Sequence, residues 1–442
     1  MEFAPPETLA QTATAQTIFA PASGAGRSPI TILRLSGAAT GDILAALAGP
    51  LPPARRASLR RLCWHGELLD QALVLWFPAP HSYTGQDCAE LHLHGGRAVL
   101  AGVTAALRQA GARPAEPGEF TRRAVLGGQM DLLAAEAIAD LVDAETSAQR
   151  QQALRQLHGG LGTLYAGWTE RLRRALAWQE AVIDFADQDL PDDVAATAHA
   201  ELVALHQEMG EHLADGRRGE RLREGLVFVI VGAPNVGKSS LLNALAGDDI
   251  AIVSTIAGTT RDAVTARLEC GGIPVELIDT AGLRDGADAV EAEGIRRARA
   301  LADRADLVIG VIAPDAAAPI RACDLMVFNK TDLAPPPAGS LPAGTLGVSA
   351  RSGAGIAALH ARLVAHARAL AAPGDLPTLT RARHRAAIEQ GVHHLADAQH
   401  APWADQRAED LRLALACLGR ITGAVSTEAV LDEVFATFCI GK

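Results

Sequence analysis

The chain has no long apolar run and no recognisable metal or disulfide pattern. Across its 442 residues, no apolar stretch approaches the ~18 residues that span a bilayer. Charges appear at Glu2 and Glu7, where a signal peptide would have a basic segment followed by an apolar one. The six cysteines include no C-x-x-C pair and no zinc-ligand spacing. These absences favour a cytoplasmic protein with reduced thiols and no membrane contact.

Aromatic residues and excess positive charge are also scarce. Aromatics make up 4% of the chain against 49% hydrophobic residues, so the cores should consist of Ala, Leu, Val and Ile. The net charge of −11 argues against a whole-surface nucleic-acid binder. Any RNA contact would be local, based on shape, or supplied by a partner. The length exceeds that of one ordinary domain, so several domains are expected.

Residues 1–122 are predicted to form a mixed α+β domain. Strands are expected at Ile30–Leu35, Ala72–Phe77 and Ala89–His94, and a helix at Ala98–Gln109. His92 and His94 would share one strand face, where a zinc pair is conceivable. Because no third ligand with suitable spacing is visible, ordinary partly buried histidines are the favoured interpretation.

Residues 123–223 have the long Ala- and Leu-rich stretches of a helical domain. Asp131 is expected to cap the helix that follows it. An apolar stripe typical of a packed helix face is formed by Leu202, Leu205, Met209 and Leu213. The mixed charges of Arg217–Arg223 are interpreted as a solvated linker to the next domain.

Residues 224–368 alternate strand and helix patterns, as a doubly wound α/β domain does, and residues 369–442 return to helical periodicity. The apolar positions of the tail are Val430, Leu431, Val434, Phe435 and Phe438. So short a tail must bury this stripe on another part of the chain, and the helices of 131–223 are the expected partner. The α/β domain is therefore predicted to be an insertion into a helical domain.

The stretch GAPNVGKSS, from Gly232 to Ser240, fits the pattern G-x-x-x-x-G-K-S. It follows the apolar run Leu226–Val231, a predicted strand, and precedes a predicted helix. Loop amides and the helix dipole would then converge on a phosphate. Lys238 is expected to reach the outer phosphates, and the Ser239 hydroxyl to hold magnesium. The sequence therefore predicts a nucleotide site.

Three further motifs follow in the order and spacing of a GTPase. Val275–Asp279 is a predicted strand that leads into DTAG, where Asp279 would lie near the magnesium and the Gly282 amide near the γ-phosphate. In VFNKTD, the Asp332 carboxylate can accept both the imino and the exocyclic amino hydrogens of guanine, whereas adenine offers neither pattern. The Ser349-Ala350 backbone can donate to the guanine keto oxygen.

The segment IVSTIAGTTRD lies between the loop and DTAG, and Thr260 in it is the expected second magnesium hydroxyl. Leu283 stands where a Ras-type GTPase has a water-orienting glutamine, so another group must position water. The residues expected to contact GTP are Asn235, Val236, Gly237, Lys238, Ser239, Ser240, Ser254, Thr255, Ile256, Ala257, Gly258, Thr259, Thr260, Asp279, Thr280, Ala281, Gly282, Asn329, Lys330, Thr331, Asp332, Ser349, Ala350 and Arg351.

Five motifs together resemble one family end to end. They are SYTGQDCAELHLHGG (82–96), PGEFTRRA (117–124), GTTRD (258–262), DTAGLRD…VE (279–291) and the terminal FCIGK (438–442). On these the chain resembles the MnmE (TrmE) family of tRNA modification GTPases. The resemblance implies an N-terminal α+β dimerisation and folate domain, and a helical domain interrupted by an inserted Ras-like P-loop G domain.

The resemblance also implies chemistry at particular residues. Potassium would be held by Asn235, Ser254, Ile256 and Thr259 in place of an arginine finger, and Glu291 would orient the attacking water indirectly. Glu291, Lys238 and Asn235 would then be the residues that carry GTP hydrolysis. A 5-formyl- or methylene-tetrahydrofolate would contact Arg34, Glu90, Gln129 and Lys442, with Cys439 close by in a role related to the modification. Gln129 stands where the family usually has a lysine, so the folate contacts lose one charge.

The implied function is a potassium-activated, magnesium-dependent GTPase acting as a homodimer. With an FAD-dependent partner of the MnmG type, in a heterotetramer, it would modify the 5-position of the wobble uridine of certain tRNAs. An alternative from another class is a GTP-switched ribosome-assembly or RNA-binding factor of the Era type, which leaves the N-terminal domain and the CIGK tail unexplained. A third is a folate-dependent enzyme in which GTP is purely regulatory.

Overall fold

The computed structural model describes residues 16–24, 26, 28–184, 192–247, 264–279, 300–314, 322–337, 341–372, 377–425, 428–436, 438–439 and 441. At residues 192–198, 264, 428–429 and 433 it describes the backbone alone. The chain divides into two compact units. We call Met1–Ala139 with Gly419–Lys442 the N-terminal unit, and Asp140–Leu418 the central unit.

The N-terminal unit contains a six-stranded sheet in the order β3-β4-β5-β2-β1-β6. Its strands pair antiparallel except β1 with β6, which are parallel. The strands are β1 (Ile18–Pro21), β2 (Ile30–Ser36), β3 (Ser58–Trp64), β4 (Glu67–Phe77), β5 (Cys88–His94) and β6 (Arg113–Pro114). The helices that follow β2 and β5 are α2 (Thr40–Ala48) and α3 (Arg97–Gln109).

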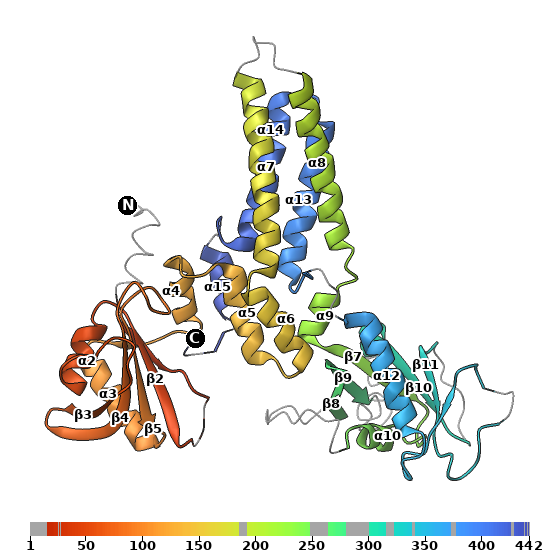
Figure 1. Ribbon diagram of the computed structural model, residues 1–442. Coiled ribbons are helices and arrows are strands. Elements are labelled where there is room, and N and C mark those ends of the chain that lie inside the picture. The colour runs from red at the N-terminus through yellow and green to blue at the C-terminus, as the bar shows by residue number, and fades with distance from the viewer. Residues whose placement is uncertain are drawn as a thin grey trace, which may run out of the picture. The chain divides into compact units, whose positions relative to one another are not determined.

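The three strands and the helix predicted in this region are confirmed as β2, β4, β5 and α3. Side chains alternate along β5, so that Leu91 and Leu93 enter the core while the histidines between and after them face away from it. Val103 and Leu107 of α3 pack into the same apolar cluster. The apolar face of α3 therefore packs against the apolar face of β5, and Figure 1 shows the helix lying against the sheet.

The remaining helices of this unit are α4 (Glu119–Leu126), the first part of α5 (Leu132–Asp143) and α15 (Glu428–Ala436). The Asp131 carboxylate accepts the Ala134 amide at 2.7 Å, which confirms the predicted cap. Leu431, Val434, Phe435 and Phe438 pack with Leu132 and Ala135 of α5. The apolar stripe of the tail is thus buried against α5, the first helix of the region 131–223 that was expected to be its partner.

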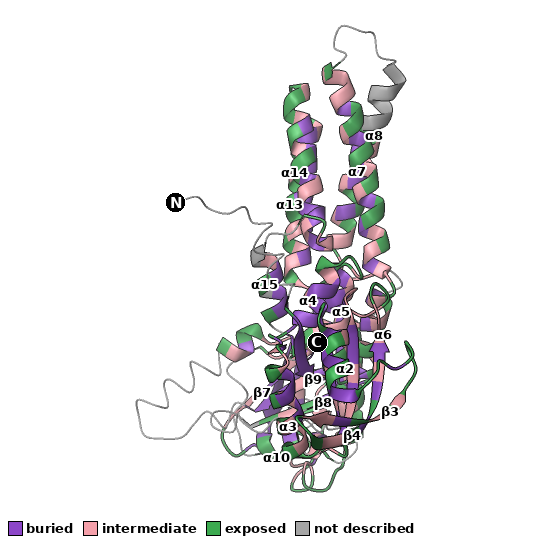
Figure 2. Cartoon of the chain, turned by 90° about the vertical axis from the view of Figure 1, so that its left-hand side faces the viewer, coloured by how far each residue is buried: buried purple, intermediate pink, exposed green. Residues whose placement is uncertain are grey.

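The central unit contains a bundle of long helices (Figure 1). The long helices are α7 (Gly160–Asp184), α8 (Asp192–Leu213), α13 (Ala382–His400) and α14 (Ala404–Thr422), and the shorter α6 (Ser147–Leu157) precedes α7. Leu202, Leu205 and Met209 are buried, as the stripe predicts. Figure 2 shows buried positions recurring among exposed ones along α7 and α13, the pattern of helices that share a core.

The second sheet also lies in the central unit, in the order β12-β11-β10-β7-β9-β8. All its pairs are parallel except β8 with β9. The strands are β7 (Leu226–Gly232), β8 (Val264–Cys270), β9 (Ile273–Asp279), β10 (Leu307–Ile312), β11 (Leu325–Phe328) and β12 (Leu346–Gly347), and the helices are α10 (Lys238–Leu245) and α12 (Ile356–Ala371). This is the predicted α/β domain, and β7 and β9 are the strands expected before the loop and before DTAG.

The segment Arg217–Arg223 is not the solvated linker that its charges suggested. Arg218–Glu224 forms helix α9, and Glu220 within it is only 2% exposed. The Glu220 carboxylate accepts Arg217 Nε at 2.6 Å and Arg385 Nε at 2.8 Å. The linker interpretation was wrong because the cation that allows this carboxylate to be buried comes from α13, far along the chain.

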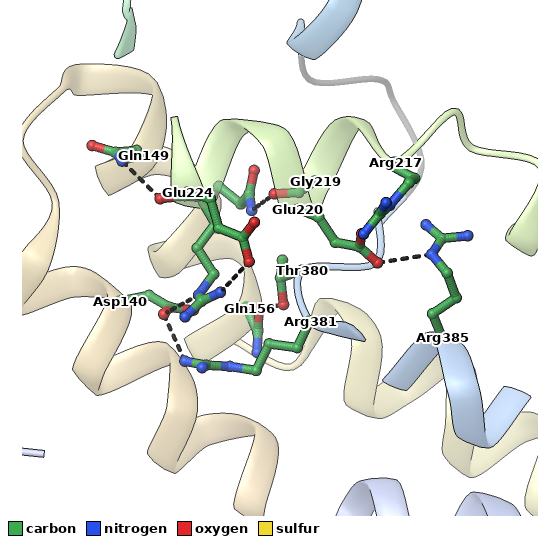
Figure 3. Close-up of polar contacts among 12 residues, drawn as sticks. Asp140, Gln149, Gln156, Arg217, Gly219, Glu220, Glu224, Thr380, Arg381 and Arg385 are labelled. Carbon is green, nitrogen blue, oxygen red and sulfur yellow. Dashed lines mark hydrogen bonds and ion pairs between the residues drawn. The ribbon is translucent and has the colours of Figure 1, made fainter. Parts of the chain in front are cut away.

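Helix α9 contacts both the helices of the bundle and the core of the α/β domain. Leu222 is fully buried in the α/β core, and Glu220 bonds to Arg385 of α13. Asp140 of α5 accepts Arg223 at 3.0 Å and Arg381 at 2.6 Å, so one carboxylate joins three segments (Figure 3). Within the central unit, these contacts fix the position of α9, the helix that leads directly into β7.

Candidate functional site

The phosphate loop runs from the end of β7 to the start of α10. Gly237, the residue before the helix, has a φ of +92°, and a Cβ there would lie 2.5 Å from Asn329 Nδ2. Only glycine satisfies both the left-handed backbone and this close approach. Asn235 also has a positive φ, +63°, which asparagine tolerates better than most residues. The loop thus has a backbone shape that its sequence specifies.

Lys238 is the first residue of α10 and is 5% exposed. Its Nζ donates to the carbonyl oxygens of Gly232 at 3.1 Å and Ala233 at 3.0 Å. These bonds hold the ammonium group across the loop, beside the amides at the N-terminus of α10. A positive charge and a helix dipole at one place form an anion site.

Ser239 and Asp279 form a second part of the site. The Ser239 hydroxyl donates to Asp279 Oδ2, and Asp279 is fully buried at the end of β9. A hydroxyl and a carboxylate oxygen in direct contact are ligands of the kind Mg²⁺ prefers. The residues present therefore fit a magnesium ion beside the phosphates.

The residues predicted to recognise the base are tied to the phosphate loop. Asn329 Nδ2 donates to the Val236 carbonyl at 2.9 Å, and Lys330 Nζ donates to the Asn235 carbonyl at 2.7 Å. The Ala350 amide donates to Asn329 Oδ1 at 3.1 Å. The predicted motifs after β7, β11 and β12 therefore form one connected site.

Asp332 is exposed and accepts the Ser349 hydroxyl at 2.6 Å. That hydrogen bond, helped by the charges of Arg351 and Lys330, lowers the pKa of Asp332 below its usual value of 3.8. The carboxylate is thus held as an anion that can accept two hydrogens from guanine. Thr331 is placed in the same loop by its amide, which donates to the Val348 carbonyl at 3.1 Å.

Sequence reasoning missed two contacts in this site. It offered a backbone amide of Ser349-Ala350 to guanine and did not foresee that the Ala350 amide donates to Asn329 Oδ1. It also gave no role to the Ser349 hydroxyl, which orients Asp332. The only signal available was the serine and alanine pair after a strand, and the backbone path that brings it to Asn329 is not a local property.

Several predicted residues lie outside the described part of the chain. They are Ser254, Thr255, Ile256, Ala257, Gly258, Thr259, Thr260, Thr280, Ala281, Gly282, Leu283, Glu291 and Lys442. The second magnesium hydroxyl, three of the four potassium ligands and the water-orienting glutamate are among them. They remain predictions.

A second candidate site lies on the sheet of the N-terminal unit. Arg34 of β2 and Glu90 of β5 are direct partners across the two strands, with Nη2 and Oε1 2.9 Å apart. The Arg34 guanidinium lies over the Tyr83 ring at 5.1 Å and the Phe120 ring at 5.9 Å. Both charged side chains are about one-fifth exposed, 22% each. An accessible carboxylate, a guanidinium and aromatic rings suit a planar heterocycle with an acidic group.

The C-terminal segment approaches the same sheet. The Cys439 carbonyl accepts the Gly118 amide at 3.3 Å, and a Cβ at Gly441 would lie 2.0 Å from the Pro21 carbonyl oxygen. Gly441 has a φ of +103°, so glycine is required there on two grounds. Pro21 follows Ala20, the β1 partner of Arg34, so the terminal glycine lies near the Arg34 site.

Gln129 and Cys439 are both exposed. The Gln129 side chain lies against Gly85, in the loop that carries Tyr83 over Arg34. The structure thus brings Arg34 and Glu90 into contact and places Gln129 beside the loop that covers them. His94 Nδ1 lies 2.7 Å from Asp70 Oδ1 and His92 Nε2 3.7 Å from Glu90 Oε2, and across the described residues neither histidine belongs to a group of three metal ligands.

Known proteins are similar to the chain over nearly its whole length. The family model for the MnmE helical domain matches residues 132–439, and that for the GTP-binding protein TrmE N-terminus matches residues 17–129. The tRNA modification GTPase MnmE of Gluconacetobacter diazotrophicus is 59% identical over 435 residues, covering 96% of this chain and 98% of that protein. Its counterpart from Granulibacter bethesdensis is 53% identical, covering 97% and 99%.

Among solved structures, Aquifex aeolicus Era bound to GDP and AlF4− is 25% identical, covering 38% of this chain and 66% of that one, with a TM-score of 0.26. So low a score supports no inference about this chain.

No helix in the described ranges has the length and apolar character needed to cross a membrane.

Proposed function

The chain belongs to the MnmE family of tRNA modification GTPases, and from that membership we propose its specific reaction. It acts with an FAD-dependent partner of the MnmG type on the 5-position of the wobble uridine of certain tRNAs. An aminomethyl-type group is installed there, with its one-carbon unit taken from a 5-formyl- or methylene-tetrahydrofolate. What supports the proposal is identity of 59% over 96% of the chain to a relative named for tRNA modification.

Within the nucleotide site, each described residue has a distinct role. Lys238 neutralises charge on the outer phosphates, because its ammonium is already fixed across the loop. Ser239 and Asp279 supply oxygen ligands for Mg²⁺, which stabilises the negative charge of the phosphates when bound. Asp332 selects guanine, and Asn329 keeps the base loop in contact with the phosphate loop.

Potassium takes the place of an arginine finger in this proposal. Asn235 is one ligand, with Ser254, Ile256 and Thr259 as the others and Thr260 completing the magnesium site. The support from the described residues concerns Asn235, whose backbone is fixed by the bond from Lys330 and by its own left-handed conformation. A ligand on a fixed backbone can hold a cation beside the phosphates with little reorganisation.

Glu291 orients the attacking water in this account. Leu283 cannot do so, because an aliphatic side chain has no hydrogen-bonding group. Removal of the carboxylate by Glu291→Ala should therefore abolish turnover and leave GTP affinity unchanged.

The folate site comprises Arg34, Glu90, Gln129 and Lys442, with Cys439 nearby. Glu90 accepts hydrogens from the edge of the heterocycle, and the Arg34 charge attracts the acidic tail. Support comes from the contact of these two side chains under the Tyr83 ring and from the approach of the C-terminal segment to Pro21. A titration of 5-formyl-tetrahydrofolate should give saturable binding that Arg34→Ala or Glu90→Ala weakens by about tenfold or more.

We place this reaction in the cytoplasm and in a homodimer that joins the partner protein in a heterotetramer. The net charge of −11 supports tRNA contact mainly through that partner. Mass spectrometry of tRNA nucleosides from a deletion strain tests the proposal. We expect loss of the 5-substituted wobble uridines. Unchanged wobble uridines together with a ribosome-assembly defect would instead support a factor of the Era type.

A further inference from the structure

Three potential metal ligands converge between α13 and α14 of the central unit, and none of them belongs to the nucleotide site. His394 and Asp397 are three residues apart on α13, and Asp410 is on α14. One ligand atom from each side chain can be chosen so that all three lie within 4.8 Å of one another. His394 Nδ1 and Asp410 Oδ1 are 4.0 Å apart, which is too long for a hydrogen bond.

Two atoms of this cluster are buried without a partner. His394 Nδ1 and Asp410 Oδ2 are shielded from solvent, and neither has a hydrogen bond. The side chains as a whole are 25% and 14% exposed. A buried polar atom without a hydrogen-bond partner is energetically unfavourable. A cation bound between these two atoms would remove that cost.

The charges of the cluster lead to the same conclusion. Within the described ranges, neither Asp397 nor Asp410 pairs with a lysine or arginine, and the ion-pair partner of Asp397 is His393, 3.5 Å away. Two neighbouring carboxylates with no lysine or arginine partner among the described residues repel each other, and a bound cation would relieve that repulsion.

We propose that His394, Asp397 and Asp410 bind a first-row divalent transition-metal ion, of which Zn²⁺ is the probe of choice. One imidazole nitrogen and two carboxylate oxygens match the ligands of such ions, whereas Mg²⁺ and Ca²⁺ prefer oxygen alone. Metal–ligand bonds of about 2.1 Å place tetrahedral ligands about 3.4 Å apart, so small side-chain rotations close the site. Because Asp397 is half-exposed, water can take the remaining position.

The ion would tie α13 to α14. Helix α13 also carries Arg385, the residue that binds Glu220 of α9. Bound metal should therefore stabilise the bundle.

Calorimetric titration of Zn²⁺ into the full-length, nucleotide-free protein tests the site. His394→Gln and Asp410→Asn should each weaken one Zn²⁺ site per chain by about tenfold or more. The matched control is His400→Gln, an exposed histidine on the same helix whose Nδ1 lies 2.8 Å from the Ala396 carbonyl oxygen. It should bind Zn²⁺ like the wild type.

Circular dichroism shows whether each variant is folded, and Asp397→Asn, on the surface, serves if the other two are not. The thermal midpoint should rise with Zn²⁺ in the wild type and the control but not in the cluster variants. Equal Zn²⁺ affinity in the wild type and the variants would overturn the proposal. It would also be overturned if acidification stabilised the cluster and Zn²⁺ did not, because a proton on His394 would then satisfy Asp410.

Discussion

At the scale of residues, the nucleotide site is held together by side chains that bond to the backbone of another loop. Asn329 donates to the Val236 carbonyl, Lys330 to the Asn235 carbonyl and Lys238 to the loop it follows. These hydrogen bonds therefore hold the loop predicted to bind the base against the loop predicted to bind the phosphates. The Ser349 hydroxyl holds the Asp332 carboxylate, the group predicted to bind guanine.

Asp332→Asn should weaken GTP binding by about tenfold or more and should favour xanthosine triphosphate. An amide replaces one acceptor with a donor, which opposes the hydrogens of guanine but matches the extra keto oxygen of xanthine. Competition between the two nucleotides for the purified protein measures the change. Glu269→Gln, an exposed carboxylate on β8, is the control and should leave the preference for guanine intact. A variant at Asp332 that still prefers GTP would remove this residue from the base site.

The residue types of this site could be predicted, but their contacts could not. The glycine-lysine loop and NKTD are local patterns, and Lys238, Ser239 and Asp279 lie where those patterns place them. Asn329 and Val236 are 93 residues apart, so their hydrogen bond depends on the order of β7, β10 and β11 in the sheet. A local pattern carries no information about that pairing.

At the scale of elements, α9 links the helices of the bundle to the G domain. This short helix buries Leu222 in the α/β core and Glu220 against Arg385, and it leads directly into β7. A cation 165 residues away decides whether its charges are solvated or buried, which is why the sequence suggested a linker. The amphipathic helices that pack through apolar stripes, α8 and α15, could be predicted because their periodicity is local.

Glu220→Ala should lower the free energy of unfolding of the central unit by about 3 kcal/mol, because it leaves Arg385 partly buried without this carboxylate. Urea unfolding followed by helix content measures the loss. Glu224→Ala on the same helix is the matched control, since its carboxylate side chain is 61% exposed and pairs with Arg223 at the surface. Its effect should be within about 0.5 kcal/mol. Equal effects of the two substitutions would show that α9 is not anchored through Glu220.

The bundle should lose stability between about pH 6.5 and pH 4 through His212. Burial lowers the pKa of this imidazole from 6.5 to about 4, and the ring lies against Tyr165 and Trp168. The unfolded chain then binds a proton that the folded chain does not, so the contribution is complete above pH 6.5 and is lost on acidification. The loss is on the order of 3 kcal/mol.

Urea unfolding at a series of pH values measures this slope. His212→Gln should flatten it, whereas His158→Gln, at an exposed histidine, should not. If the slope survives in His212→Gln, another group is responsible for the acid sensitivity.

At the scale of the whole molecule, each compact unit carries one predicted site. The N-terminal unit has Arg34 and Glu90 with the returning C-terminal segment, and the central unit has the GTP site. The segments 248–263 and 280–299, which carry the residues predicted to bind potassium and to orient water, lie outside the described chain.

GTP turnover should be at least about tenfold faster in K⁺ than in Na⁺ at equal ionic strength. A cation of the right size next to the phosphates neutralises the charge that an arginine would otherwise neutralise. Steady-state phosphate release measures the ratio, and Asn235→Ala should bring it close to one. Equal rates in both salts for the wild-type protein would contradict the potassium assignment.

The central claim is that GTP turnover by this chain drives modification of the wobble uridine. Its most direct test is mass spectrometry of tRNA nucleosides from a deletion strain that carries either the wild-type chain or Glu291→Ala. We predict that the wild type restores the 5-substituted uridines and that Glu291→Ala, shown separately to bind GTP without hydrolysing it, does not. Full restoration by the inactive variant would contradict the account.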